Sequence, residues 1–143
     1  MNIATEQVQA HVPVTIMKLQ GELDASSYLD VIAGAKQLYQ AGTRNLLLDL
    51  SDVSFMSSSG LVALHSVATL MRGQEPLDPE AGWSAMHSIA NDIETAGGYE
   101  AHLKLLNPQP RVEKTLDITG FKNILEVFID KQAAVTAFEA IKD

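Results

Sequence analysis

The sequence of 143 residues contains no cysteine. This absence excludes disulfide frameworks, thiolate nucleophiles, iron–sulfur clusters and cysteine-based zinc sites. The apolar runs are only a few residues long, far short of the ~20 needed to span a bilayer. Basic residues are scarce too, because 10 Lys and Arg stand against 18 Asp and Glu, a formal net charge of −8. That balance argues against binding to nucleic acid and against binding to an anionic membrane surface.

The remaining composition is that of a soluble globule, with 46% hydrophobic and 20% charged residues. The length is close to the ~150 residues typical of one domain, so we expect a single domain over residues 1–143. Residues 1–10 lack the basic and apolar regions of a secretory signal. We therefore expect a cytoplasmic protein.

Strand and helix patterns alternate along the chain, which predicts the α/β class. Apolar runs and alternation predict strands at residues 3–10, 12–20, 45–50, 102–106 and 123–128, with a polar loop after the third. Helical spacing predicts about four helices, at 26–40, after Ser57–Gly60, from Pro110 to Gly120 and from Asp130 through Ile141. Pro13 should separate the first two strands, so we expect a mixed sheet of four to five strands.

Two local signals bear on the first helix. Ser27 and Asp30 have the spacing of a capping box, with Asp in place of the usual Glu. Gly42 is suited to stop the helix that they begin.

One segment departs from the alternation, at about residues 73–100. It holds six acids and no Lys or Arg, so it carries six of the eight net negative charges. Proline and glycine bracket a helical pattern with an apolar stripe: Trp83, Met86, Ala90 and Ile93. We interpret it as an inserted acidic segment with a short amphipathic helix. Its stripe either packs on the domain or, through the Trp83 segment, joins a partner or a second copy.

Three motifs occur in order along the chain. Gly21-Glu22-Leu23-Asp24 closes a strand, a fourteen-residue block runs from Leu48 to Leu61, and Asn107-Pro108-Gln109-Pro110 precedes a helix. Together they resemble the STAS domain, in particular the stand-alone anti-sigma-factor antagonists. The resemblance covers about residues 12–72 and 101–141.

The resemblance implies a function as a partner-switching protein. Such proteins are phosphorylated on a serine by a kinase that is also an anti-sigma factor; unphosphorylated, they bind that kinase and release its sigma factor, and a phosphatase resets them. By motif position the phosphoacceptor is Ser58, with Ser57 and Ser59 as alternates. The implied partner-binding residues are Asp24, Ser57, Ser58, Ser59 and Gly60, and Asp24 matches the acid that family members place beside the serine.

The sequence departs from the family at two places. The residue before the acceptor is commonly Asp, but here it is Ser57, which leaves three consecutive hydroxyls. The segment at 73–100 has no counterpart in the minimal antagonists, so it could alter the choice of partner. Two alternative functions therefore stay open: a STAS scaffold subunit of a larger signalling assembly, and a cytoplasmic STAS regulator of a membrane transporter.

Simpler explanations exist for the same residues. A serine run before a helix is commonly an N-cap, and Asp24 could cap a helix as well. His11, His65, His87 and His102 lack the spacing of metal ligands, so we expect neither a metal site nor a cofactor, and His65 should pack among its neighbours. A serine hydrolase would require the motif Gly-x-Ser-x-Gly around its nucleophile, and the sequence lacks this motif because Met56 stands two residues before Ser58. We expect a substrate and binding module, not an enzyme.

Overall fold

Five strands form one mixed sheet in the spatial order β1-β2-β3-β4-β5. The computed structural model describes residues 1–75, 83–95 and 98–138, and for residues 83–86 and 88 it describes the backbone alone. The elements follow one another as β1 Asn2–Gln9, β2 Pro13–Leu23, α1 Tyr28–Gln40, β3 Leu46–Met56, α2 Ser58–Met71, α3 Trp83–Thr95, β4 Leu103–Leu106, α4 Pro110–Ile118, β5 Val127–Phe128 and α5 Lys131–Ala137. The predicted α/β class and the mixed sheet of four to five strands are confirmed, with five strands present among the described residues.

The first two strands form the antiparallel part of the sheet. They pair from Asn2 opposite Gln20 to Gln9 opposite Pro13, so the turn falls just before the proline, as predicted. Each later strand pairs in parallel with its neighbour, from β2 with β3 to β4 with β5. The carboxyl ends of β2 and β3 consequently meet at one edge of the sheet.

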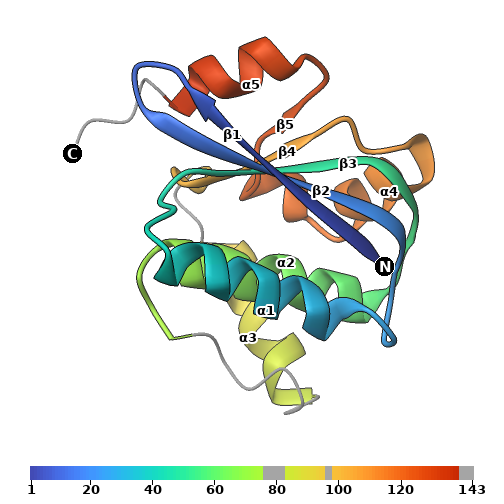
Figure 1. Cartoon of the computed structure of the whole chain (residues 1–143). Coiled ribbons are helices and arrows are strands. Elements are labelled where there is room, and N and C mark those ends of the chain that lie inside the picture. Colours follow the sequence, from blue (N-terminus) through green and yellow to red (C-terminus); the bar gives the residue numbers. More distant parts are fainter. Residues whose placement is uncertain (76–82, 96–97, 139–143) are drawn as a thin grey trace.

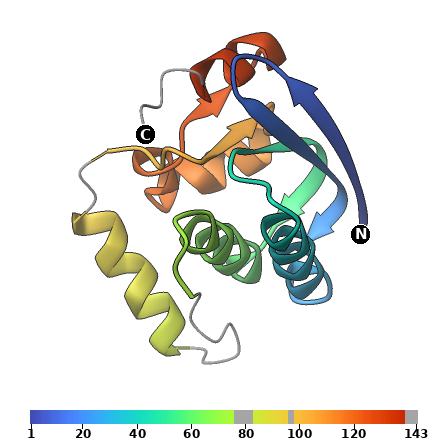
Figure 2. The same cartoon turned by 60° about the vertical axis from the view of Figure 1, so that its left-hand side comes forward.

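Helices cover both faces of the sheet (Figure 1). On one face, side chains of α1, α2 and α4 join the inward residues of the central strands in the larger core cluster. On the other face α5 packs through Ala134, Val135 and Phe138 against Val14, Ile16, Leu47 and Leu106. Figure 2 shows α3 beside α2, and its Ile89 joins the same larger cluster.

The third strand is longer than the sequence predicts. We expected a polar loop after residue 50, but β3 continues to Met56 and stays paired with β2 up to Leu23. Pairing passes from Lys18–Asp49 to Gln20–Asp52, and later from Gly21–Val53 to Glu22–Phe55, so β3 gains one residue on β2 at each place. These two bulges displace the alternation of buried and exposed residues, which made a strand look like a loop.

The predicted strand at 123–128 is wrong for its first part. A 3₁₀ turn spans Phe121–Asn123, and the Phe121 carbonyl accepts from the amides of Ile124 and Leu125 at 3.1 and 2.8 Å. Gly120, with φ of +85°, ends α4 and lets the chain fold back into the core. Only Val127 and Phe128 remain free to pair with β4.

Helix α1 begins at Tyr28, and its predicted capping box does not form. Ser27 stands at the N-cap, but its hydroxyl donates to the carbonyl of Glu22 at 2.7 Å and makes no cap bond. The predicted stop is confirmed, since α1 ends at Gln40 and Gly42 follows with φ of +112°.

A helix forms in the acidic segment, as predicted, but its buried side differs from the predicted stripe. Ile89 is buried and Ile93 is partly buried, whereas Ala90 is exposed. The side chains of Trp83 and Met86, residues 76–82 and 96–97, and Ile141 lie outside the described residues. Self-association through the Trp83 segment therefore stays a prediction. In the described part of the chain, no helix has the length and apolar character to cross a bilayer.

Candidate functional site

The three serines lie where β3 passes into α2. The Ser57 amide donates to the carbonyl of Leu23 at 2.9 Å, which ties the start of α2 to the end of β2. Leu23 and Met56 are the last residues of β2 and β3, and they pair with each other. Asp24 and Ser57, the next residues along the chain, therefore follow two adjacent strand ends. The structure thus brings the first motif and the serine run together at the carboxyl edge of the parallel strands, where α/β proteins commonly bind ligands.

The three hydroxyls differ in their surroundings. Ser57 is the N-cap of α2, and its Oγ accepts from the Gly60 amide at 3.4 Å. Ser58 is exposed, whereas Ser57 and Ser59 are half-buried. Ser58 is therefore the most accessible of the three hydroxyls.

Gly60 is buried, and packing accounts for a glycine there. A Cβ at this position would lie 2.7 Å from Met56 Cγ and 2.8 Å from the Leu23 carbonyl oxygen. Because glycine has no Cβ, the first turn of α2 can pack directly against the end of β2, and this packing sets the position of Ser58 relative to the sheet. A contact of Gly60 with a partner stays a prediction.

Asp24 faces Ser26 in this structure. Its Oδ1 accepts from the Ser26 hydroxyl at 2.6 Å and from the Ser26 amide at 2.9 Å. These two bonds, the hydroxyl first, hold the pKa of the Asp24 carboxyl below its usual value. The Asp24 carbonyl accepts from the Tyr28 amide at 2.9 Å, so Asp24 orders the turn into α1. In the described structure its carboxylate does not bond the Ser58 hydroxyl, so its role beside that serine also stays a prediction.

The amino end of α2 can accept negative charge. The first amides of a helix, here including those of Ser58 and Ser59, lack partners within it, and the helix dipole is positive at this end. No acidic residue occupies the first turn of α2. Arg111, at the start of α4, places its guanidinium 5.1 Å from the ring centroid of Phe55, which lies near the end of β3.

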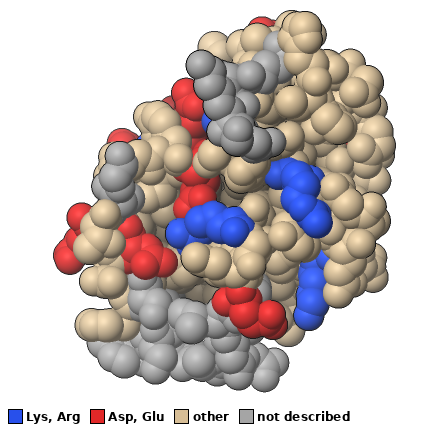
Figure 3. All heavy atoms as spheres, turned by 90° about the vertical axis from the view of Figure 1, so that its left-hand side faces the viewer, with Lys and Arg blue, Asp and Glu red and all other residues tan. Residues whose placement is uncertain are grey.

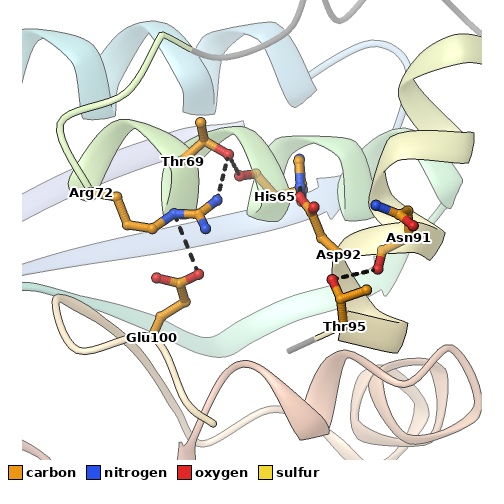
Figure 4. Close-up of polar contacts among 7 residues, drawn as sticks. All are labelled: His65, Thr69, Arg72, Asn91, Asp92, Thr95 and Glu100. Atoms are coloured by element: carbon orange, nitrogen blue, oxygen red, sulfur yellow. Dashed lines mark hydrogen bonds and ion pairs between the residues drawn. The ribbon is translucent and has the colours of Figure 1, made fainter. Parts of the chain in front are cut away.

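Sequence reasoning missed a polar contact between α2 and α3 (Figure 4). His65 is buried, as expected, and its Nε2 donates to Asp92 Oδ2 at 2.6 Å. Arg72 follows α2 and pairs with Glu100 at 3.5 Å, and burial raises the pKa of the Glu100 carboxyl. Among the described residues no group of three or more His, Asp or Glu side chains could hold a metal ion.

A cavity of about 350 Å³ lies at the opposite end of the sheet, lined in part by Tyr39, Arg44, Arg72 and His102. Figure 3 shows basic side chains gathered on this face of the molecule. Arg44 donates to the Tyr39 carbonyl at 2.8 Å and stacks on the Tyr39 ring at 3.9 Å, while Arg72 is the C-cap of α2. Both cations therefore lie at helix carboxyl ends, where positive charge is favourable.

Comparisons with known proteins agree with this arrangement. No curated protein matches the sequence. Among solved structures, an anti-sigma factor antagonist from Mycobacterium paratuberculosis is similar at a TM-score of 0.63 and 18% identity, with 96% of this chain and 95% of that one covered. The Bacillus cell fate determinant SpoIIAA in its phosphorylated form is similar at a TM-score of 0.55 and 19% identity, over 94% of this chain and 97% of that one.

Both identities are low, so these likenesses establish the fold alone. The family comparison goes further, because the STAS domain matches residues 3–75, just over half of the chain. That match includes Asp24, the serine run and the whole of α2, and it stops before α3. The chain belongs to the STAS domain family.

Proposed function

We propose that this protein is an anti-sigma-factor antagonist, switched by phosphorylation of Ser58. The unphosphorylated form binds a serine kinase that is also an anti-sigma factor, and thereby releases the sigma factor. A phosphatase removes the phosphate and resets the protein. The chain then acts in the cytoplasm as a substrate and binding module, while the kinase supplies the general base and the Mg-bound ATP.

The exposure of Ser58 at the first position of α2 carries this proposal. Its neighbour Ser57 is engaged as the N-cap, and Gly60 seats the helix against Leu23, so Ser58 is the hydroxyl that the fold presents. A phosphate at this position meets the amino end of a 14-residue helix, where amides and the dipole favour an anion. The fold can therefore accept the modification without rearrangement.

A local change of charge is large enough to act as the switch. Phosphorylation adds about −1.5 to −2 charges at neutral pH. Against a partner carboxylate about 5 Å away, at an effective dielectric constant of ~20, the repulsion is about 5–7 kcal/mol before screening. A hundredfold loss of affinity needs only about 2.7 kcal/mol. Asp24 and the exposed Glu22 sit at the adjacent strand end, so they would add to the negative charge that the partner meets.

A structural neighbour gives independent support for this kind of switch. The similar structures include SpoIIAA in its unphosphorylated form, described as an anti-sigma factor antagonist, as well as in its phosphorylated form. That protein thus exists in both states on the same fold. The unphosphorylated form is similar to this chain at a TM-score of 0.52 and 20% identity, over 98% of this chain and 100% of that one.

The test is phosphosite mapping by mass spectrometry after incubation with Mg-ATP and a lysate of the cells that produce the protein. We expect a single phosphate on Ser58 that is lost in Ser58→Ala and kept in the matched control Ser54→Ala, which removes an exposed hydroxyl from β3. Phosphate retained by Ser58→Ala would move the acceptor to Ser57 or Ser59. No phosphate at all, beside a labelled positive-control substrate, would overturn the proposal and favour the scaffold or the transporter role.

A further inference from the structure

Ser58 begins a line of side chains along α2 that leads toward α3. Residues three or four apart share a helix face, so Ser58 is followed on its face by Val62, His65, Thr69 and Arg72. Ser58 is exposed, whereas His65 and Thr69 are buried. At 1.5 Å per residue, about 10 Å of helix separates the predicted phosphoacceptor from the histidine that contacts α3.

Helix α3 is docked on this part of the molecule through a small set of contacts. Ile89 joins the main core at 3% exposure, and Ile93 packs so closely on Gly120 that a Cβ there would lie 2.9 Å from its Cγ2. The His65–Asp92 bond fixes α3 to α2 at a third point. Figure 2 shows α3 alongside α2, with its other side turned away from the domain.

The chain is also tied where it leaves α2 and where it returns toward β4. The guanidinium of Arg72 pairs with Glu100, whose amide donates to the Ile124 carbonyl at 2.8 Å. Thr69 Oγ1 accepts from Arg72 and donates to the His65 carbonyl, so the His65–Asp92 bond and the Arg72–Glu100 pair share one network (Figure 4). The Arg72–Glu100 pair therefore ties the segment after α3 to the end of α2.

We propose that α3 forms part of the surface on which the Ser58 partner docks, and that His65 and Asp92 are positioning residues that hold it there. A standard interface buries about 800 Å² on each protein, a round patch about 16 Å in radius. Measured along α2, that radius reaches past His65, whose Nε2 contacts Asp92 of α3. The STAS match ends at residue 75, so α3 lies outside the residues that it covers.

This inference rests on the proposed function and deepens it, since the occupant is the kinase that modifies Ser58. The test compares two measurements on the full chain. Hydrogen exchange of the α3 amides reports whether α3 is docked, and it needs only the purified protein. The concentration dependence of Ser58 phosphorylation, measured with a fixed amount of the same lysate, reports an apparent KM and, because the kinase concentration is then constant, the kcat of each variant relative to the native chain.

We expect Asp92→Ala to speed exchange in α3 by at least about tenfold and to raise KM by about tenfold with kcat unchanged. Asp92→Asn keeps an acceptor for His65 and should restore both values toward those of the native chain. The matched control Asp117→Ala removes an exposed acid from α4 and should change neither. If Asp92→Ala leaves α3 protected, the double variant Ile89→Ala/Asp92→Ala releases it for the same comparison.

If a variant shows fast exchange in α3 but an unchanged KM, α3 lies outside the surface that the partner contacts, and the inference is overturned. A fall in kcat alone would do the same, because it would indicate a disturbed Ser58 and not a lost contact. If the native chain receives no phosphate on Ser58, the proposed function fails and the inference fails with it. The exchange data separate these cases, because they do not depend on the kinase.

Discussion

Replacing Gly60 by alanine should weaken the fold at the start of α2. The added Cβ would stand 2.8 Å from the Leu23 carbonyl oxygen and 2.7 Å from Met56 Cγ, both closer than ordinary contact. Leu23 cannot easily retreat, because its carbonyl also accepts from the Ser57 amide at 2.9 Å. Met56 is 4% exposed and has little free space around it.

The expected size follows from two opposed effects. Overpacking of this kind costs about 1–3 kcal/mol of unfolding free energy. Alanine regains up to about 1 kcal/mol over glycine within a helix. We therefore expect a net loss of about 1–2 kcal/mol, or a fall in Tm of about 3–6 °C for a domain of this size.

Gly34 in α1 provides a matched control. A Cβ there would meet Met17 Cε at 2.8 Å, the end of a flexible side chain, and the next atom is 3.9 Å away. Gly34→Ala should therefore stay within about 1 kcal/mol of the native chain, because the methyl group can move and the helix gains propensity. Urea unfolding of both variants would refute the reasoning if Gly60→Ala proved as stable as Gly34→Ala.

Three further predictions concern charge. Ser26→Ala should raise the pKa of Asp24, which an NMR titration of that carboxyl would measure. As the pH falls, the stability that this carboxylate contributes above pH 3.8 should then be lost at a higher pH than in the native chain. Glu100 has a raised pKa, so the native state binds its proton more tightly than the unfolded state, and stability should fall as the pH rises above 4.5; urea midpoints of Glu100→Gln should lack this fall. Ser58→Asp should be about 0.3–1 kcal/mol more stable than Ser58→Asn in urea, since it places a charge at the amino end of α2; equal stability would contradict this.

The spacing of apolar residues predicted most helices and strands, because burying one face of an element requires apolar residues at that element's own period. The stripe in α1 was found because Val31 and Ala35 are buried toward the sheet. The period-two pattern failed to predict the second half of β3, because two bulges leave Leu50, Val53 and Met56 buried at intervals of three residues. Period-two alternation cannot reveal a strand whose register shifts, and the shifts depend on β2, which local sequence does not contain.

The candidate site divides in the same way. The serine run and Asp24 belong to local motifs that the sequence displays, but only the family resemblance implied that they lie together. Their place at adjacent strand ends comes from the pairing of β2 with β3. The His65–Asp92 bond joins residues 27 apart through helices whose mutual packing no local pattern encodes. Histidine beside apolar residues predicted burial, but nothing in the sequence identified its partner.

The first turn of α2 holds no acidic residue, so the amino end of this helix carries no negative charge before Ser58 is phosphorylated. The family resemblance places Asp where this chain has Ser57, and an N-cap carboxylate would already partly neutralise the helix dipole. Here the N-cap is an uncharged hydroxyl, and the carboxylate of Asp24, which follows the paired end of β2, is bonded to Ser26. A phosphate on Ser58 would therefore be the first negative charge on that helix end. The fold should favour it, while a partner that docks on the unmodified surface would meet the whole change in charge, so stability and affinity should move in opposite directions on phosphorylation.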